Sequence, residues 1–331
     1  MHIPPPLHPG AKVAVLATSG VCDPAKLAKG VGVLQSLGLV VQVMESCHAS
    51  HDYLAGPDAL RLRDLHTAFA DKEIKAIFVA RGGYGAARLL PWLDYAMIRQ
   101  NPKIFVGFSD VTALHIVLNQ FCKLATLHGP MPAACFGAGE IDPLTFASFK
   151  DALFGSVFFR FGTANLETLH PGGLYFSASE TFGVRHANVR ILDTKEAHTK
   201  DFRQENVLTG ILTGGNLSVI ASTLGTPYEI ETRNRILFLE EVNEVPYRVD
   251  RLLLQLKLSG KLRDAAGIVF GDFSPETLQS LSTAVQELVL TEEKPTVWGL
   301  PCGHSGQNIT LPLGRAVSIV TGHGKYLAHP Y

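Results

Sequence analysis

Short apolar runs alternate with amphipathic stretches through the first half of the chain, and this alternation is the strongest constraint on its fold. Apolar runs of strand length occupy residues 12–17, 39–44, 76–80 and 104–108, and helical patterns cover 24–37, 57–69 and 110–121. Strands that are apolar on both faces and alternate with helices form a parallel sheet covered on both sides. We therefore expect an α/β fold whose N-terminal half is a doubly wound, mostly parallel sheet.

The composition and the hydrophobic periodicity of the sequence change after the N-terminal half. Between about residues 154 and 208 Gly, Thr, His and charged residues accumulate and the helical period fades, which indicates a crossover with some β-hairpin content. Strand patterns return at 235–240 and 266–271, and helical patterns at 217–224, 246–258 and 275–290. We expect an N-terminal α/β nucleophile domain at 1–155, a crossover and variable linker at 156–208, and a smaller mixed α/β C-terminal domain at 209–331.

Charge and cysteine content exclude several classes of protein. The chain carries 29 basic and 30 acidic side chains, so it lacks the positive surface that grips nucleic-acid phosphates or anionic membranes. No apolar run approaches the roughly 20 residues of a membrane helix, and the first residues lack the features of a secretory signal. Five scattered cysteines without a C-x-x-C pair are typical of free thiols in a reducing compartment. We expect a soluble cytoplasmic protein with no nucleic-acid or membrane partner.

Two turns that follow predicted strands could carry chemistry, because ligands of open parallel sheets bind beyond the carboxyl ends of the strands. In Arg81-Gly82-Gly83-Tyr84-Gly85, adjacent glycines allow backbone N–H groups to converge on an anion. Neither common phosphate-binding pattern is present, and a tight turn that needs positive φ also explains the glycines. Ser109 stands where a buried strand turns into a helix, as in a nucleophile elbow. The structural alternative for Ser109 is a helix N-cap.

A serine nucleophile needs a base, and the base needs a group that orients it. His304 lies in a loop rich in Gly and Pro, whereas His115 fits a packed helix position and His128 precedes Gly-Pro. Glu240 and Glu241 end an otherwise apolar strand, which is where an orienting carboxylate would be placed, although a solvated strand end is the commoner role of such a residue.

Metal ligands are weakly represented. His48 and His51 lie near Cys47, but no third ligand follows at a recognisable interval and no H-E-x-x-H motif occurs. We expect no metal and no other cofactor.

Motifs spread over nearly the whole chain resemble the LD-carboxypeptidase family of serine peptidases, which includes the murein tetrapeptide carboxypeptidases. The resemblance is carried, in chain order, by Arg81–Gly85, Asn101–Leu114, His128–Met131, Leu212–Leu217, Ile236–Glu240 with Pro246–Arg251, Gly303-His304 and Asn308–Gly314. It is weakest at 157–204.

The resemblance implies roles for individual residues. Ser109 would be the nucleophile, His304 the general base and Glu240 the orienting carboxylate. Backbone N–H groups of Gly82, Gly83 and Asp110 would form the oxyanion hole. Arg81 and Tyr84 are candidate substrate-binding residues. From residue chemistry alone, Arg81, Arg233 and Arg248 are candidate carboxylate clamps, and a surface or packing cation is the equal alternative for each of the three.

The same resemblance implies a reaction and an assembly. Such enzymes, without a metal, release carboxy-terminal D-Ala from murein tetrapeptide in cell-wall recycling, and they are usually homodimers. One alternative is an immunity peptidase of the microcin C type, which cleaves aminoacyl- or peptidyl-nucleotides and stacks the nucleobase on an aromatic side chain. Neither Trp92 nor Trp298 lies in the poorly matched loop. A second alternative is a non-catalytic protein that binds small anions at the glycine turn.

Overall fold

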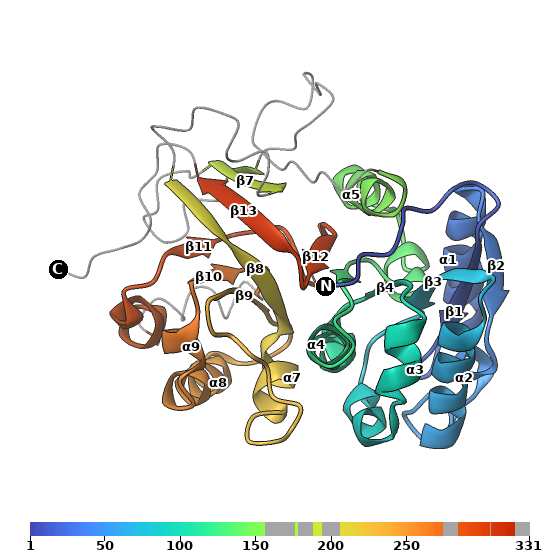
Figure 1. Ribbon diagram of the computed structural model, residues 1–331, viewed down its shortest axis with the longest axis horizontal. Helices are drawn as coiled ribbons and strands as arrows, with labels where there is room; N and C mark the ends of the chain where they lie inside the picture. Colours follow the sequence, from blue (N-terminus) through green and yellow to red (C-terminus); the bar gives the residue numbers. More distant parts are fainter. Residues whose placement is uncertain (156–175, 178–187, 194–205, 274–283, 305, 322–331) are drawn as a thin grey trace. The chain divides into compact units, whose positions relative to one another are not determined.

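The chain forms two compact units, which the computed structural model describes over residues 1–155, 176–177, 188–193, 206–273, 284–304 and 306–321 (Figure 1). The first unit comprises 1–155 with 225–229 and 306–314, and the second comprises the described parts of 156–224, 230–305 and 315–331. Both units are α/β, so the fold class expected from the sequence is confirmed.

The first unit is built on a six-stranded sheet of order β12-β5-β4-β3-β1-β2. All neighbouring strands are parallel except β12 and β5. The chain runs outward from β1 to β2 and then returns past β1 to β3, so the direction of winding reverses between β1 and β3. Ligands of doubly wound sheets bind at such a reversal, beyond the carboxyl ends of the strands. The strands are β1 (Lys12–Leu16), β2 (Val40–Val43), β3 (Ile74–Val79), β4 (Ile104–Gly107), β5 (Thr126–His128) and β12 (Leu311–Leu313).

Helices cover this sheet because its strands are apolar on both faces. Val13, Val15 and Phe78 share one core cluster with residues of α1 and α5, while Phe105 on the other face stacks on Phe69 of α2. The side chain of Asp23 accepts a hydrogen bond from the N–H of Lys26 and so caps α1, which begins at proline as the sequence predicts. The helices are α1 (Pro24–Ser36), α2 (Asp58–Ala70), α3 (Tyr95–Gln100), α4 (Thr112–Gln120) and α5 (Pro143–Phe154), with short helical turns at Glu45–His48, Ala86–Trp92, Ser109–Val111 and Pro132–Phe136.

Two segments from the C-terminal half, residues 225–229 and 306–314, belong to the first unit, and no local sequence pattern predicts this. The backbone N–H groups of Asn308 and Thr310 donate to the hydroxyls of Thr145 (2.8 Å) and Ser148 (3.2 Å) on α5. Residues 311–313 then add strand β12 beside β5. The domain limits expected from the sequence, 1–155, 156–208 and 209–331, stay predictions.

The second unit is built on a seven-stranded mixed sheet of order β11-β10-β9-β8-β13-β7-β6. The four strands from β11 to β8 are parallel, and β13, β7 and β6 continue the sheet with antiparallel pairing. Its strands are β6 (Phe176–Ser177), β7 (Asn188–Asp193), β8 (Asn206–Asn216), β9 (Arg235–Glu240), β10 (Gly267–Phe270), β11 (Thr296–Trp298) and β13 (Ala316–Thr321); its helices are α7 (Leu217–Ser222), α8 (Pro246–Leu258) and α9 (Lys261–Asp264), with helical turns at Val285–Val289 and Leu290–Glu292.

Several expected elements differ from those observed. The helix expected at 110–121 begins with a 3₁₀ turn at Ser109–Val111 before α4, because the chain turns sharply after β4. Of the helix expected at 275–290, residues 275–283 lie outside the described residues, and Val285–Val289 is a single π-helical turn. Much of the predicted linker at 156–208 also lies outside the described residues. None of the described helices combines the length and the hydropathy needed to cross a membrane.

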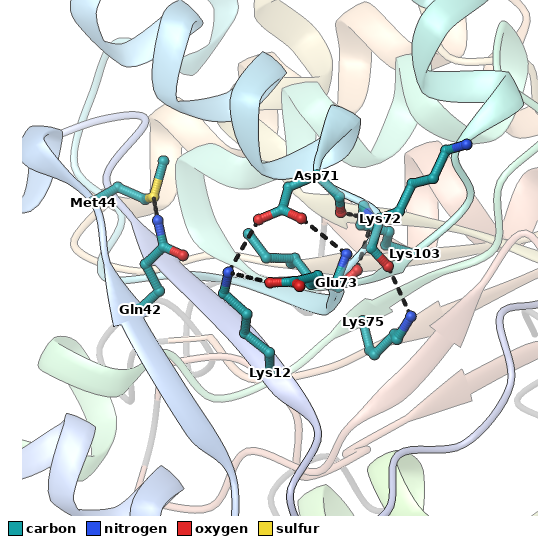
Figure 2. A network of polar contacts seen from close by, with 9 residues as sticks. Lys12, Gln42, Met44, Asp71, Lys72, Glu73, Lys75 and Lys103 are labelled. Carbon is teal, nitrogen blue, oxygen red and sulfur yellow. Dashed lines mark hydrogen bonds and ion pairs between the residues drawn. The ribbon is translucent and has the colours of Figure 1, made fainter.

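Two lysines form ion pairs and hydrogen bonds at the end of the first sheet where its parallel strands begin (Figure 2). Lys12 Nζ lies 3.2 Å from Asp71 Oδ2 and 3.1 Å from Glu73 Oε2, and buried Lys103 donates to the carbonyls of Asp71 and Ile74 at 2.6 Å each. Burial lowers the pKa of Lys103. A cavity of about 500 Å³ opens beside these groups, lined by prolines and lysines. It lies at the opposite edge from the turns that carry Ser109 and the paired glycines.

Candidate active site

Ser109 occupies a strained backbone conformation directly after β4. Its φ is +64°, which side chains other than glycine rarely adopt. It serves neither following helix as a cap, because Phe108 and Val111 are the residues that precede the 3₁₀ turn and α4. A serine that is half-buried, strained and placed at a strand-to-helix turn fits the nucleophile elbow better than the N-cap alternative.

The glycine turn after β3 lies against this serine. A Cβ built on Gly82 would be 2.9 Å from both Cβ and Oγ of Ser109 and 3.6 Å from the backbone nitrogen of Asp110. Gly83 has φ of +118°. Within the described part of the chain, the N–H groups of Gly82 and Gly83 donate to no other group. The turn therefore brings free backbone donors next to a hydroxyl, as an oxyanion hole requires.

Hydrogen bonds with the segment that follows β1 hold the start of the glycine turn that follows β3. The N–H of Gly20, which follows β1, donates to the carbonyl of Gly82 at 3.1 Å. Arg81 donates through Nη1 to the carbonyl of Val21 at 2.8 Å and through Nε to that of Gly82 at 3.3 Å. The guanidinium of Arg81, a candidate substrate ligand in the sequence, is thus engaged by backbone.

Two buried side chains hold the end of the same turn. Fully buried Arg61 of α2 donates to the carbonyl of Gly85 at 3.0 Å and also to that of Thr18. The carboxylate of Asp110 accepts from the N–H of Ala86 at 2.8 Å, and burial raises the pKa of this carboxyl. Asp110, the residue after Ser109, therefore ties the Ser109 turn to the end of the glycine turn.

Glu240 and His304 form a hydrogen-bonded pair in the second unit. Glu240 is the last residue of β9 and is fully buried, while the side chain of His304 is 19% exposed. The distance from His304 Nδ1 to Glu240 Oε2 is 2.7 Å. A buried carboxylate that accepts from Nδ1–H fixes the orientation and the tautomer of the ring.

The pKa values of this pair are shifted by opposing causes. Burial raises the pKa of Glu240, and the hydrogen bond and charge of His304 work against that rise. Burial alone would lower the pKa of His304, but the hydrogen bond and charge of Glu240, with the charges of Glu241 and Asp272, raise it on balance. The imidazole is therefore a stronger base than a free histidine.

A close approach of backbone at Gly303 brings His304 to Glu240. Gly303 has φ of +147°, and a Cβ on it would lie 3.0 Å from Cβ of Asp272 and 3.1 Å from Oε2 of Glu240. The N–H of Asp272, after β10, donates to the carbonyl of Cys302 at 2.9 Å. Only glycine fits this position, so the Gly-His pair in the sequence has a structural reason.

Glu241 has a different task from Glu240, which the sequence pattern alone could not distinguish. Its carboxylate accepts hydrogen bonds from the N–H of Ser218 (2.8 Å), the amide of Asn216 (3.1 Å) and its neighbour's N–H at Val242 (2.9 Å). Asn216 and Ser218 lie at the start of α7. Glu241 therefore stabilises the start of that helix.

The two other histidines considered in the sequence are buried in the first unit. His115 is 1% exposed, and its ring nitrogens lie 2.9 Å from Thr126 Oγ1 and 2.8 Å from the carbonyl of Gly107. Burial lowers the pKa of His115 to about 4. His128 is fully buried at the end of β5 and packs against Phe108. The expectation that His115 is a packed core residue is confirmed.

The remaining candidates are dispersed. Tyr84 is 54% exposed beside the glycine turn. Arg233 and Arg248 lie at the surface of the second unit, 3.5 Å from Asp264 and Glu244 respectively. Among the described residues, no three His, Cys, Asp or Glu side chains converge as a metal ion would require.

Arg61 is the residue of this region that sequence reasoning missed. Its place in an amphipathic helix predicts a solvated cation, and no local signal marks it as the buried support of two loops. Asp58 and Arg88, which extend its ion-pair network, were missed for the same reason.

Comparisons with known proteins agree with the resemblance seen in the motifs. Residues 13–129 match the model of the LD-carboxypeptidase N-terminal domain, and residues 209–319 match that of the C-terminal domain. The chain is 37% identical over 326 residues to the probable murein peptide carboxypeptidase of Bacillus subtilis, covering 96% of this chain and 91% of the relative. It is 30% identical over 312 residues to the murein tetrapeptide carboxypeptidase of Pseudomonas aeruginosa, covering 92% and 91%.

Solved structures show the same fold. The crystal structure of muramoyltetrapeptide carboxypeptidase from Oxalobacter formigenes matches with a TM-score of 0.70 and 27% identity, covering 94% of this chain and 98% of that one. An MccF-like protein from Bacillus anthracis matches with a TM-score of 0.80 and 23% identity, covering 98% and 100%, and this likeness is one of fold. Both domain models match in order and full-length relatives share at least 30% identity, so this chain is a peptidase of the LD-carboxypeptidase family.

Proposed function

We propose that this chain is a serine LD-carboxypeptidase that hydrolyses the L,D peptide bond of murein tetrapeptide and releases its carboxy-terminal D-Ala. Ser109 is the nucleophile, His304 the general base and Glu240 the carboxylate that orients it. The backbone N–H groups of Gly82, Gly83 and Asp110 form the oxyanion hole.

In the first half of the reaction, Ser109 Oγ attacks the scissile carbonyl carbon while His304 Nε2 takes the hydroxyl proton. The carbonyl oxygen becomes an oxyanion, which accepts hydrogen bonds from the donors of the glycine turn. Collapse of this intermediate breaks the C–N bond. His304 gives its proton to the departing amine, so D-Ala leaves and the tripeptide stays as an ester on Ser109.

In the second half, water replaces the amine. His304 takes a proton from water, the hydroxide attacks the ester carbonyl, and the same donors hold the second oxyanion. Breakage of the ester bond returns the proton to Ser109 Oγ and frees the tripeptide. Glu240 stays ionised and pairs with the imidazolium at each stage.

The 2.7 Å contact between His304 and the buried Glu240 carboxylate is the observation that carries the proposal. Burying a carboxylate is unfavourable unless a partner stabilises its charge. A histidine that is partly exposed and backed by such a group is the arrangement expected of a general base. The names of the relatives from Bacillus subtilis and Pseudomonas aeruginosa support murein peptide as the substrate.

The test is D-Ala release from purified murein tetrapeptide. We expect wild-type turnover to be independent of a chelator, and Ser109→Ala, His304→Ala and Glu240→Ala each to lower kcat by at least about 10³-fold. Arg263→Ala, at the surface of the second unit, is the control and should stay active. Release of D-Ala by Ser109→Ala at the wild-type rate would contradict the mechanism, and no release by the wild type would contradict the substrate.

The same assay separates the alternatives. An aminoacyl-sulfamoyl adenosine offered beside the tetrapeptide tests the nucleotide-cleaving reading, since an immunity peptidase of that kind would cleave it faster. A serine-directed phosphonate tests the non-catalytic reading, which predicts that Ser109 stays unlabelled.

We also propose that the enzyme works in the cytoplasm as a homodimer, without nucleic-acid or membrane partners. All five cysteines are free thiols, which fits a reducing compartment. Light scattering on a size-exclusion column measures the dimer, and fractionation of cells measures the location.

A further inference from the structure

Two exposed tyrosines meet beside the glycine turn of the first unit. Tyr84 is two residues beyond Gly82, and its ring centroid lies 5.9 Å from that of Tyr53 with 57° between the planes. Tyr53 is 62% exposed and Tyr84 is 54% exposed. Single exposed apolar groups are common on protein surfaces, but this pair is joined through a short turn to the backbone that contacts Ser109.

Both tyrosines stand on backbone that is held in place. Tyr84 lies between Gly83 and Gly85, whose φ values are +118° and +129°, and the carbonyl of Gly85 accepts from buried Arg61. The carbonyl of Tyr53 accepts from the N–H of Val21 at 3.4 Å. Loops fixed in this way can present side chains to a ligand at little further cost in conformational entropy.

Arg88 adds a positive charge to this aromatic pair. Its Nε donates to both carboxylate oxygens of Asp58, at 3.0 and 2.9 Å, and its side chain is 45% exposed. Arg88 lies four residues beyond Tyr84, and its partner Asp58 also pairs with Arg61, which donates to the carbonyl of Gly85 next to Tyr84. As far as the chain is described, the two terminal nitrogens of Arg88 have no protein partner.

Two arginines share the carboxylate of Asp58. Asp58 pairs with Arg61 as well as with Arg88, so one carboxylate faces two guanidinium groups. The free donors are the terminal N–H groups of Arg88 and the two phenol hydroxyls. A planar guanidinium with two free nitrogens matches the two oxygens of a carboxylate.

We infer that Tyr53, Tyr84 and Arg88 form a subsite that binds a carboxylate of the murein peptide next to the glycine turn. This inference rests on the proposed function. A murein tetrapeptide offers three carboxylates, on the terminal D-Ala, on the diaminopimelate side chain and on D-Glu. The chemistry of the subsite is the same for all three, so the substrate is varied to tell them apart.

The experiment compares four peptides: the tetrapeptide and three versions in which one carboxylate is amidated. For the carboxylate that binds here, amidation should lower the wild-type kcat/KM about 10–100-fold, as the loss of a charge-assisted hydrogen bond does. Arg88→Gln should lower kcat/KM for the unmodified peptide by a similar factor and remove the penalty for that one amide. Arg88→Lys should retain part of the wild-type kcat/KM for the unmodified peptide. Tyr53→Phe and Tyr84→Phe should each lower kcat/KM by a smaller factor, again only for peptides that carry this carboxylate.

Arg263→Gln is the matched control, because it removes a surface arginine that also pairs with an aspartate, Asp264, and that is no candidate for substrate binding. It should leave all four values of kcat/KM unchanged. Thermal unfolding of each variant reports whether Arg88→Gln disturbs the fold, and the tyrosine variants remove only exposed hydroxyls.

If Arg88 has a purely structural role, Arg88→Gln should lower the turnover of all four peptides by one common factor. That result would overturn the inference, and so would no loss of turnover at all. Neither result would affect the proposed function. Failure of the wild type to cleave the unmodified tetrapeptide would instead defeat the proposed function. Binding of the four peptides to Ser109→Ala, measured by calorimetry, then tests the subsite without turnover: a selective penalty that Arg88→Gln removes supports it, and equal affinities overturn it.

Discussion

Replacement of Gly82 by alanine tests whether the glycine turn works with Ser109. The added methyl would lie 2.9 Å from both Cβ and Oγ of Ser109, closer than real Cβ atoms approach other atoms, so the serine or the turn must move. Displacing one oxyanion donor costs about 3–4 kcal/mol of transition-state stabilisation. We therefore expect kcat for D-Ala release to fall about 10²–10³-fold, with a loss of about 1–3 kcal/mol in the free energy of unfolding from overpacking.

The assay is single-turnover release of D-Ala from murein tetrapeptide, together with chemical denaturation of each protein. Gly32→Ala is the matched control, because a Cβ on this exposed residue of α1 would meet nothing within 4 Å. Alanine exceeds glycine in helix propensity by about 1 kcal/mol, so this variant should be fully active and slightly more stable. Wild-type kcat in Gly82→Ala would refute the placement of the turn against the nucleophile.

Three further changes separate the roles of individual buried groups. Glu240→Gln removes the main cause that raises the pKa of His304, so burial then lowers it; kcat should fall by about 10²–10⁴-fold, and the acid limb of the pH–rate profile should move to lower pH. If the acid limb of Glu240→Gln stayed at the wild-type pH, the pairing of Glu240 with His304 would be contradicted. Glu241→Gln turns one acceptor at the start of α7 into a donor and should lower the free energy of unfolding by about 1–3 kcal/mol, while moving that limb to lower pH by less than Glu240→Gln does, because the charge of Glu241 makes a smaller contribution to the pKa of His304. His115 has a folded pKa of about 4 against 6.5 when free, so the unfolded state takes up its proton first as the pH falls. Stability should decline between these two values by up to about 3 kcal/mol, and His115→Gln should decline less over the same range; equal slopes would show that His115 is not the group.

The strands, the glycine turn and the position of Ser109 could be predicted because each depends on a short local sequence pattern. β9 runs from Arg235 to Glu240 and α8 begins at Pro246, as the apolar run and the proline indicate. The positions of the glycine turn and of Ser109 followed from one rule, that chemistry gathers after the carboxyl ends of parallel strands. Residue chemistry alone could not choose between an N-cap and a nucleophile at Ser109, and only the resemblance carried by the order of motifs along the chain favoured the nucleophile.

Long-range placement was beyond local patterns. Arg61 looks like a surface residue of α2, yet it is fully buried, with two carbonyls and Asp58 as acceptors for its two terminal nitrogens. Glu240 and Glu241 are adjacent and chemically identical, and only the alternation of side chains at the end of β9 sends one to His304 and the other to α7. The assignment of residues 306–314 to the first unit depends on pairing with β5, which no window of sequence contains.

The backbone strain at Ser109 also has a physical explanation in its surroundings. A residue with side chain held at positive φ costs about 1–3 kcal/mol, and each hydrogen bond that fixes the neighbouring turn returns about 1 kcal/mol. Asp110 accepts from Ala86, Arg61 donates to Gly85 and Gly20 donates to Gly82, so the turn has enough fixed contacts to hold the serine in this conformation. Because these contacts exist before any substrate arrives, the donors would need no rearrangement as an oxyanion forms, and this is the condition under which backbone N–H groups stabilise a transition state more than water does.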